Sequence, residues 1–311
     1  MSLLPPDEAG VSKAAATLRE GQLVAMPTET VYGLAGNATA PHAVARIYAI
    51  KGRPQFNPLI AHVLDLEAAQ REGVFSEVAL ALAQAFWPGP LTLVVPRSDR
   101  ASVCDLACAG LASIALRAPD HPVARALLSA VPFPLAAPSA NRSGKTSPTT
   151  PAHVESEFGT ALPILQGGPC RTGIESTIIA VMPDAPPRLL RPGALARDAI
   201  EALVGHLASA KGEAITAPGM LASHYAPRAA VRLNATSPLP KEAFLGFGTN
   251  TLPGWPSLSP AGDLQEAAAN LYAMLRTLDA QGHAGIAIAP IPNAGLGEAI
   301  NDRLARASAP R

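Results

Sequence analysis

Short apolar segments separated by helical patterns restrict the fold of this chain more than any other feature. We interpret as strands residues 23–26, 59–63, 91–95, 113–116, 134–137, 164–165 and 177–181. Helical spacing is predicted at residues 11–19, 41–52, 66–86, 121–130, after Thr150 and at 196–208. Because strands and helices mix without strict alternation, we predict an α/β or α+β domain around a twisted mixed sheet rather than a barrel.

The pattern changes near residue 210. Up to about residue 239 the chain is rich in Pro, Ser and Ala and has little periodicity, as linkers do. A β-α-β-α pattern follows, with strands at 244–247 and 286–291 and helices at 264–281 and 296–307. We therefore predict a first domain at 1–209, a linker at 210–239 and a small C-terminal parallel α/β domain at 240–311.

Overall composition excludes several classes of partner and site. The 24 basic and 24 acidic residues cancel, so bulk charge does not favour a nucleic-acid polymer or a membrane surface. Three cysteines do not make a disulfide framework, and Cys104 with Cys108 lacks the second ligand pair of a zinc site. With no signal-peptide pattern and no apolar run long enough to span a bilayer, we expect a cytoplasmic protein.

The most distinctive polar segment is KGRPQFNP, residues 51–58. Lys51 and Arg53 would share a face of an extended segment, where two cations are suited to grip a multiply charged anion. The alternative is a solvated helix end, since cations favour the C-terminal end of the helix dipole. The flanking Gly52, Pro54 and Pro58 favour the rigid anion-binding loop.

Two hydroxyl-rich segments follow predicted strands. Thr28, Thr30 and Tyr32 in PTETVYGLAGNA are placed to bind a polar substrate, although a capped helix start is an alternative. SANRSGKT, residues 139–146, imitates a phosphate-binding P-loop, but Ser139 replaces its first glycine and Pro148 prevents its helix. The hydroxyls and amides there still suit phosphate or ribose contacts, and a polar surface loop is the alternative.

Cations recur at predicted strand ends, and we infer from them a focused positive cleft for a nucleotide triphosphate or a similar anion. They are Lys51, Arg53, Arg117, Lys145, Arg171 and Arg191. The chain has no GxSxG, HExxH or GxGxxG motif and no cysteine beside a histidine. This residue set favours phosphoryl or nucleotidyl transfer, which needs positioning and charge neutralisation rather than a covalent nucleophile.

Seven motifs resemble those of one family. In order they are PTETVYGLAGNA, KGRPQFNPLIAHV, WPGPLTLVV, ALRAPDHPVA, APSANRSG, GIESTII and LLRPG. Their order and spacing resemble the YrdC-type threonylcarbamoyl-AMP synthases. APGMLASHYAP and GLGEAINDRLARAS are similar to the linker and the C-terminal domain of the two-domain form. The resemblance implies a YrdC-like catalytic domain at 1–209, with the mixed sheet of that type, and a Rossmann-like domain at 240–311.

The same resemblance implies a nucleotidyltransferase that converts L-threonine, bicarbonate and ATP to threonylcarbamoyl-AMP and pyrophosphate. The product would serve threonylcarbamoylation of the adenosine beside the anticodon in tRNA, through a downstream tRNA threonylcarbamoyl transferase complex. A Mg²⁺ ion is implied by ATP use, held mainly by phosphates, with no metal ligand assigned in the chain. Direct tRNA binding, linker motion and the oligomeric state stay open.

The resemblance also assigns site residues. The implied nucleotide-binding set, in which Lys51 and Arg53 are the catalytic cations, is Lys51, Arg53, Asn57, Ser113, Ser139, Asn141, Ser147, Arg191 and Tyr225. The implied threonine pocket is Thr30, His62, Arg117 and Ser176 or Thr177. Arg117 would grip the amino-acid carboxylate with two hydrogen bonds. His62 lies on an apolar strand and, without the resemblance, would be interpreted as a satisfied core histidine.

Two other functions compete with this one. An RNA-binding module with a basic cleft is disfavoured by the neutral total charge and the scarcity of aromatic residues. A carbamoyl-adenylate-forming maturation enzyme is disfavoured because its zinc-finger and acylphosphatase-like modules are missing from the sequence.

Leu221, Ala222 and Ser223 replace the basic or aromatic linker residues of many relatives. The linker is therefore expected to contribute shape more than charge.

Overall fold

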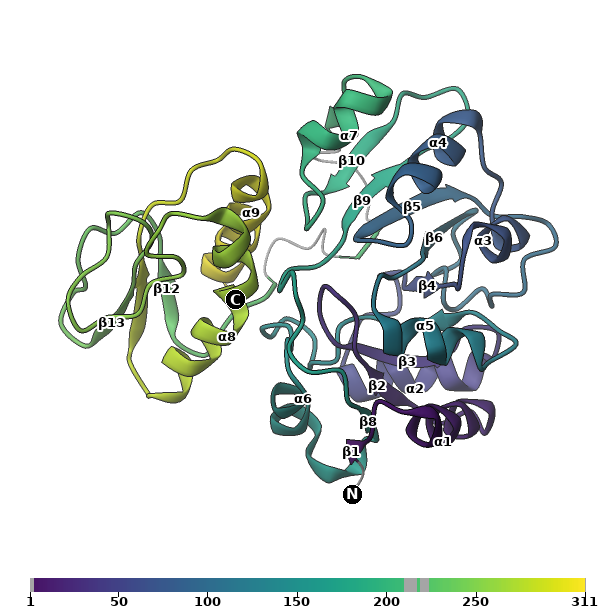
Figure 1. Cartoon of the computed structure of the whole chain (residues 1–311), viewed down its shortest axis with the longest axis horizontal. Helices are drawn as coiled ribbons and strands as arrows, with labels where there is room; N and C mark the ends of the chain where they lie inside the picture. Colours follow the sequence, from purple (N-terminus) through teal and green to yellow (C-terminus); the bar gives the residue numbers. More distant parts are fainter. Residues whose placement is uncertain (1–2, 210–216, 219–223, 311) are drawn as a thin grey trace.

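Two bodies make up the protein (Figure 1). The structure is a computed structural model and describes residues 3–209, 217–218 and 224–310. The larger body is built on an 11-stranded mixed sheet and the smaller on a 3-stranded parallel sheet. The predicted α/β class is confirmed for both.

The large sheet brings strands from distant parts of the chain together. In spatial order they are β1 (Leu3–Leu4), β8 (Ile164–Leu165), β2 (Val24–Met26), β3 (Gly33–Asn37), β7 (Leu135–Ala136), β4 (Ile60–His62), β6 (Ser113–Arg117), β5 (Leu91–Pro96), β9 (Thr177–Ala180), β10 (Arg188–Arg191) and β11 (Ala208–Ser209). Strands β4 and β6 are parallel, whereas β5 is antiparallel to β6 and parallel to β9. The carboxyl ends of β4 and β6 therefore meet the amino end of β9 at one edge of the sheet.

Helices cover both faces of this sheet. They are α1 (Glu8–Arg19), α2 (Pro41–Lys51), α3 (Leu66–Glu72), α4 (Glu77–Phe86), α5 (Pro122–Ser129), α6 (Pro151–Phe158) and α7 (Arg197–Val204), with a 3₁₀ turn at Gly159–Ala161. Alternate residues of β2 point to opposite faces, so Ala25 belongs to the cluster around Ile47 of α2 and Met26 to the cluster around Leu18 of α1. Burial on both faces explains the short, continuously apolar strands.

The smaller body follows the predicted β-α-β-α order with one strand added before it. Its sheet has the order β12 (Ala230–Arg232), β14 (Gly285–Ile288) and β13 (Glu242–Leu245). Helices α8 (Leu264–Ala280) and α9 (Leu296–Ser308) lie between that sheet and the larger body (Figure 1). Strand β12 falls within residues 210–239, the predicted linker. Residues 210–216 and 219–223 of that segment, including Leu221, Ala222 and Ser223, lie outside the described residues.

Two local differences from the predictions have clear physical causes. The alternative of a helix start after Met26 is wrong, because residues 33–37 form β3 and pair antiparallel with β2. The helix predicted at 196–208 ends at Val204, because Gly205 follows it with a φ of 78°. No helix among the described residues is long and apolar enough to cross a membrane.

Candidate active site

The KGRPQFNP segment is buried. Lys51 is the last residue of α2, and Gly52 ends that helix in the left-handed conformation with a φ of 61°. Lys51 is 3% exposed and Arg53 7% exposed. The alternative of a solvated helix end is therefore wrong, and two cations lie inside the protein.

Both cations donate to backbone carbonyls. Lys51 Nζ donates to the carbonyls of Ser139 at 2.6 Å and Asn141 at 2.5 Å, which ties α2 to the 139–146 loop. Arg53 donates to the carbonyls of Asn57 at 3.2 Å and Pro58 at 2.9 Å. An ammonium has three donors and a guanidinium five, so each group keeps N–H donors for an anion. Burial, followed by the nearby Arg53, holds the pKa of Lys51 well below its ordinary value.

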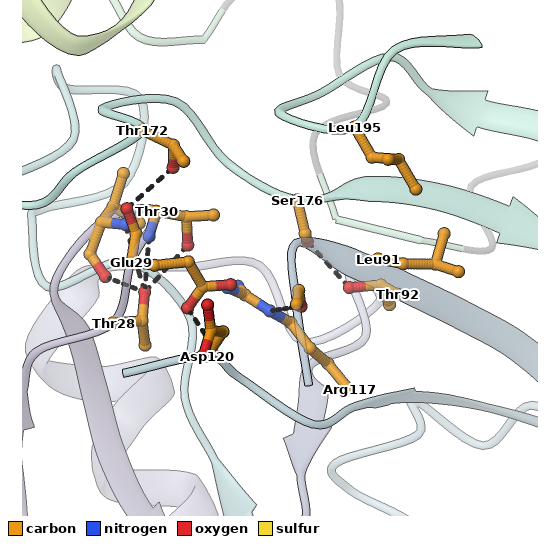
Figure 2. A network of polar contacts seen from close by, with 12 residues as sticks. Thr28, Glu29, Thr30, Leu91, Thr92, Arg117, Asp120, Thr172, Ser176 and Leu195 are labelled. Carbon is orange, nitrogen blue, oxygen red and sulfur yellow. Dashed lines mark hydrogen bonds and ion pairs between the residues drawn. The ribbon is translucent and has the colours of Figure 1, made fainter. Parts of the chain in front are cut away.

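A buried ion pair positions Arg117 at the carboxyl end of β6. Arg117 Nη2 lies 2.5 Å from Glu29 Oε1, and the two side chains are 4% and 1% exposed (Figure 2). Arg117 Nε also donates to the carbonyl of Gly89 at 3.3 Å. These bonds use Nε and Nη2, so Nη1 is left for a further acceptor.

Polar side chains of three other segments surround Arg117. His62 is its partner in the parallel β4–β6 ladder, and burial, followed by the Arg117 charge, lowers the pKa of His62 to about 3. The Thr30 hydroxyl is held 2.8 Å from that of Thr28 (Figure 2). Ser176 Oγ lies 2.8 Å from Thr92 Oγ1, whereas Thr177 donates its hydroxyl to the carbonyl of Leu195 at 2.6 Å. Of the two predicted alternatives, Ser176 therefore faces the site.

These side chains line a small cavity of about 50 Å³. The predicted site residues in its wall are Thr30, Arg53, His62, Arg117, Ser139, Ser176, Arg191 and Tyr225. Pro218 and His224 line it from the same segment as Tyr225. The space holds water-sized molecules only and is too small for a whole nucleotide.

The other predicted residues lie behind or beside this wall. Asn141 is buried and donates to the carbonyls of Arg142 and Lys145, each at 2.8 Å, which shapes the loop after Ser139. Ser147 donates to Glu175 Oε1 at 2.6 Å. Ser113 is half-buried at the amino end of β6, the end nearest Pro58 and opposite to Arg117. Of the predicted nucleotide residues, Ser113 therefore lies at the strand end away from the predicted threonine pocket, whereas Arg53, Ser139, Arg191 and Tyr225 share its cavity wall.

Unpartnered buried atoms concentrate at this site. Seven buried side-chain nitrogen or oxygen atoms of the described residues lack a hydrogen-bond partner. Three of them belong to side chains that line the cavity: His62 Nδ1, His224 Nδ1 and Tyr225 OH. Two more, Asn57 Oδ1 and Asn141 Oδ1, belong to predicted nucleotide residues outside its wall. Buried polar atoms are nearly always hydrogen-bonded, so the three atoms in the cavity wall indicate where a polar ligand would be held. His62 is thus not a satisfied core histidine.

Buried charge at the site is mainly positive, but it involves a different set of cations from the predicted one. Lys51, Arg53, Arg117 and Arg191 are buried, whereas Lys145 and Arg171 are exposed and stay outside the cavity wall. Sequence reasoning missed the two buried carboxylates, Glu29 and Glu175, and the cation Arg303 that pairs with Glu175. Although burial raises the pKa of Glu175, Arg303 and Arg191 outweigh it and lower that pKa to about 2.

Comparison with known proteins identifies the family. A family described as "Telomere recombination" matches residues 16–193, and one described as "Threonylcarbamoyl-AMP synthase, C-terminal domain" matches residues 195–309. The threonylcarbamoyl-AMP synthase of Bacillus subtilis is 39% identical over 332 residues, which cover 99% of this chain and 95% of the relative. That of Pyrococcus abyssi is 40% identical over 321 residues, covering 95% and 93%.

A solved structure extends this likeness to three dimensions. The crystal structure of P. abyssi Sua5 complexed with L-threonine matches with a TM-score of 0.88 and 38% identity, over 97% of this chain and 95% of that one. The family resemblance predicted from the seven motifs is thereby confirmed. The chain belongs to the threonylcarbamoyl-AMP synthases, a family of nucleotidyltransferases, in its two-domain form.

Proposed function

We propose that this chain forms threonylcarbamoyl-AMP and pyrophosphate from L-threonine, bicarbonate and ATP. The observation that carries the proposal is a small cavity, lined by buried side chains, in which arginines meet hydroxyl groups and a neutral imidazole. The arginines suit carboxylate and phosphate groups, and the hydroxyls and imidazole suit a hydroxy-amino acid. Both substrate classes can thus be recognised in one place.

The proposed chemistry has two steps. The threonine amine adds to the carbon of bicarbonate with loss of water, which gives N-carboxythreonine. An oxygen of this carbamate then attacks the α-phosphorus of ATP in line, and the bond to the bridging oxygen of pyrophosphate breaks. Negative charge builds on the phosphates, and we assign its neutralisation to the spare N–H donors of Lys51 and Arg53.

ATP would enter as its Mg²⁺ complex. Within the described ranges, no group of three or more His, Cys, Asp or Glu side chains is placed to hold a metal ion. The buried carboxylates Glu29 and Glu175 are already paired with Arg117 and Arg303. The ligands of the ion would therefore be phosphate oxygens and water, which makes it part of the substrate.

The proposed product is a reactive mixed anhydride that must be passed on. We assign its use to a tRNA threonylcarbamoyl transferase complex, which would modify the adenosine beside the anticodon. The proposed location is the cytoplasm, and the three free cysteines support a reducing compartment.

Pyrophosphate release tests the proposed function. The full chain is assayed with threonine, bicarbonate and ATP, and then with each of the three omitted in turn. Release is expected to require all three. Release that proceeds equally well without threonine would reject the proposal.

Replacing Arg117 with alanine is expected to raise the KM for threonine by about 10-fold or more, because the proposed carboxylate grip is lost. The KM for ATP should change much less. The substitution also leaves Glu29 buried without its cation, so Arg117→Lys is the companion variant that keeps the charge. Equal increases in both constants would contradict the assignment of Arg117 to threonine.

A further inference from the structure

The C-terminal domain reaches the wall of the cavity through a buried hydrogen-bond cluster around Glu175. The Glu175 carboxylate accepts from Arg303 Nε of α9 at 2.8 Å and from Tyr272 OH of α8 at 2.9 Å. Ser147, a predicted nucleotide residue, donates to the same carboxylate at 2.6 Å. All four side chains are buried, so solvent screens these contacts weakly.

The same two C-terminal residues support the ring of Tyr225. The Arg303 guanidinium carbon lies 5.1 Å from the centre of the Tyr225 ring, within the range of a cation–π contact. The Tyr272 ring stacks on it at 5.8 Å with an interplanar angle of 30°. The backbone conformation of Tyr225 is itself unfavourable, because a residue with a bulky side chain rarely adopts its φ of 63°. The ring contacts hold Tyr225 in this costly conformation.

The two bodies are in close contact beside this cluster. Gly173 has a φ of 72°, and a methyl group at its Cα would lie 2.5 Å from the carbonyl oxygen of Ala268 and from Cα of Ala269 in α8. Val31, Ile174 and Tyr225 from outside the small sheet share one apolar cluster with the core of the C-terminal domain. The support for Tyr225 therefore belongs to a packed, apolar interface.

We propose that Arg303 is a positioning residue for the nucleotide site, through which the C-terminal domain becomes part of the active site. It acts on two groups: directly on the Tyr225 ring, and through Glu175 on the Ser147 hydroxyl. Tyr225 OH is buried, has no partner among the described residues and belongs to a side chain that lines the cavity, so it is available to a ligand. After ATP has entered, Arg303 sets the place of this hydroxyl against the nucleotide. The inference rests on the proposed use of ATP.

A second ion pair between the domains provides a matched control. Arg197 of α7 pairs with Glu298 of α9, with Nη2 and Oε1 2.5 Å apart and the side chains 28% and 27% exposed. Neither side chain contacts Tyr225, Glu175 or Ser147 through a hydrogen bond or ion pair among the described residues. Arg197→Met thus removes an interdomain ion pair and leaves the contacts of Arg303 with Tyr225 and Glu175 in place.

The test is a double-mutant cycle on Arg303 and Tyr225, with ATP and threonine affinities measured separately by calorimetry on the full chain. Arg303→Met and Tyr225→Ala are each expected to weaken ATP binding by about 10-fold, and the double variant by clearly less than the product of the two losses, because both substitutions act on Tyr225. Arg303→Lys should recover part of the loss. Threonine affinity should stay within about 2-fold in all variants, and Arg197→Met should leave ATP affinity unchanged.

Three outcomes would overturn the inference. Additive losses in the cycle would mean that Arg303 does not act through Tyr225. A loss in Arg197→Met equal to that in Arg303→Met would indicate domain docking alone. Tighter ATP binding in Arg303→Met would mean that the guanidinium holds Tyr225 where it excludes the nucleotide.

Two precautions keep the test decisive. Arg303→Met leaves the Glu175 charge buried, so the charge-neutral pair Arg303→Met with Glu175→Gln is made as well, and the same weakening of ATP binding is expected there. The unsubstituted chain is assayed for threonine-dependent pyrophosphate release in parallel. If that activity is absent, the proposed function fails; if it is present and the cycle is additive, only the role of Arg303 fails.

Discussion

Replacing Lys51 with alanine is expected to lower the turnover of pyrophosphate release by about 100-fold or more, the scale of losing one charge contact in the transition state. Lys51 is 3% exposed, so bulk water does not reach the position of its ammonium and cannot replace the lost charge. Its Nζ also holds the carbonyls of Ser139 and Asn141, and the loop between α2 and the cavity would relax with it. Turnover is measured at saturating threonine, bicarbonate and ATP.

Lys145 is the control for this substitution. It lies on the same loop as Ser139 and Asn141 but is exposed and outside the cavity wall, so Lys145→Ala should leave turnover nearly unchanged. Because burial lowers the pKa of Lys51, the ammonium is lost at a lower pH than that of an ordinary lysine. Turnover of the unsubstituted chain should therefore fall on the alkaline side before pH 10.5, the ordinary lysine value. An unchanged rate in Lys51→Ala would remove this residue from the mechanism.

The cationic half of the site could be predicted from sequence because its residues lie in short motifs with rigid neighbours. Gly52 and the flanking prolines marked KGRPQFNP as more than a solvated helix end, and burial of Lys51 and Arg53 agrees with that interpretation. Lys145 and Arg171 carried the same kind of signal at predicted strand ends, yet both are exposed. Position at a strand end does not decide burial, since that depends on what packs over the end.

The buried pair of Glu175 and Arg303 could not be predicted in the same way. Glu175 and Arg303 are 128 residues apart in sequence, and neither stands in a motif that indicates a partner. One signal was available: Arg303 lies on the apolar face of α9 with Ile300, Leu304 and Ala307, at helical spacing. An arginine at a core position needs a buried counter-charge. A search for charged residues on the apolar face of each helix would therefore have identified Arg303 as a residue with a buried partner.

Short strands made the domain boundaries difficult to predict from the sequence. Strand β12 has three residues inside a segment rich in Pro, Ser and Ala, and it becomes a strand by pairing with β14. Strands β1 and β11, which the sequence did not predict, have two residues each. Such strands are defined by their neighbours in the sheet rather than by periodicity, so tertiary pairing decides them.

Replacing Glu29 with glutamine is expected to lower the thermal midpoint of unfolding by roughly 10 °C, since removing one partner of a buried ion pair costs about 3–5 kcal/mol. Glu29 is 1% exposed and accepts from both Arg117 Nη2 and the backbone N–H of Asp120 at 3.1 Å (Figure 2). Glutamine keeps the shape but leaves the Arg117 guanidinium without its counter-charge. Thermal unfolding of the full chain, followed by calorimetry, measures the effect.

The control is Glu67→Gln, which removes an ion pair that is exposed on both sides. Glu67 and Arg71 lie 3.6 Å apart with side chains 86% and 69% exposed, so the midpoint should change by about 1 °C or less. Equal midpoints in the two variants would show that the Glu29–Arg117 pair contributes no net stability.

Threonine should restore part of the stability lost in Glu29→Gln. If Arg117 receives the amino-acid carboxylate, threonine supplies in this variant the negative charge that Glu29 supplied, and the interaction is stronger because the guanidinium is otherwise unpaired. The rise in midpoint on adding saturating threonine should therefore exceed the rise in the unsubstituted chain. A smaller rise would mean that Glu29 is needed to orient Arg117 for its ligand. In that case the ion pair would be a preorganised part of the threonine pocket, and the KM for threonine would increase in Glu29→Gln as it does in Arg117→Ala.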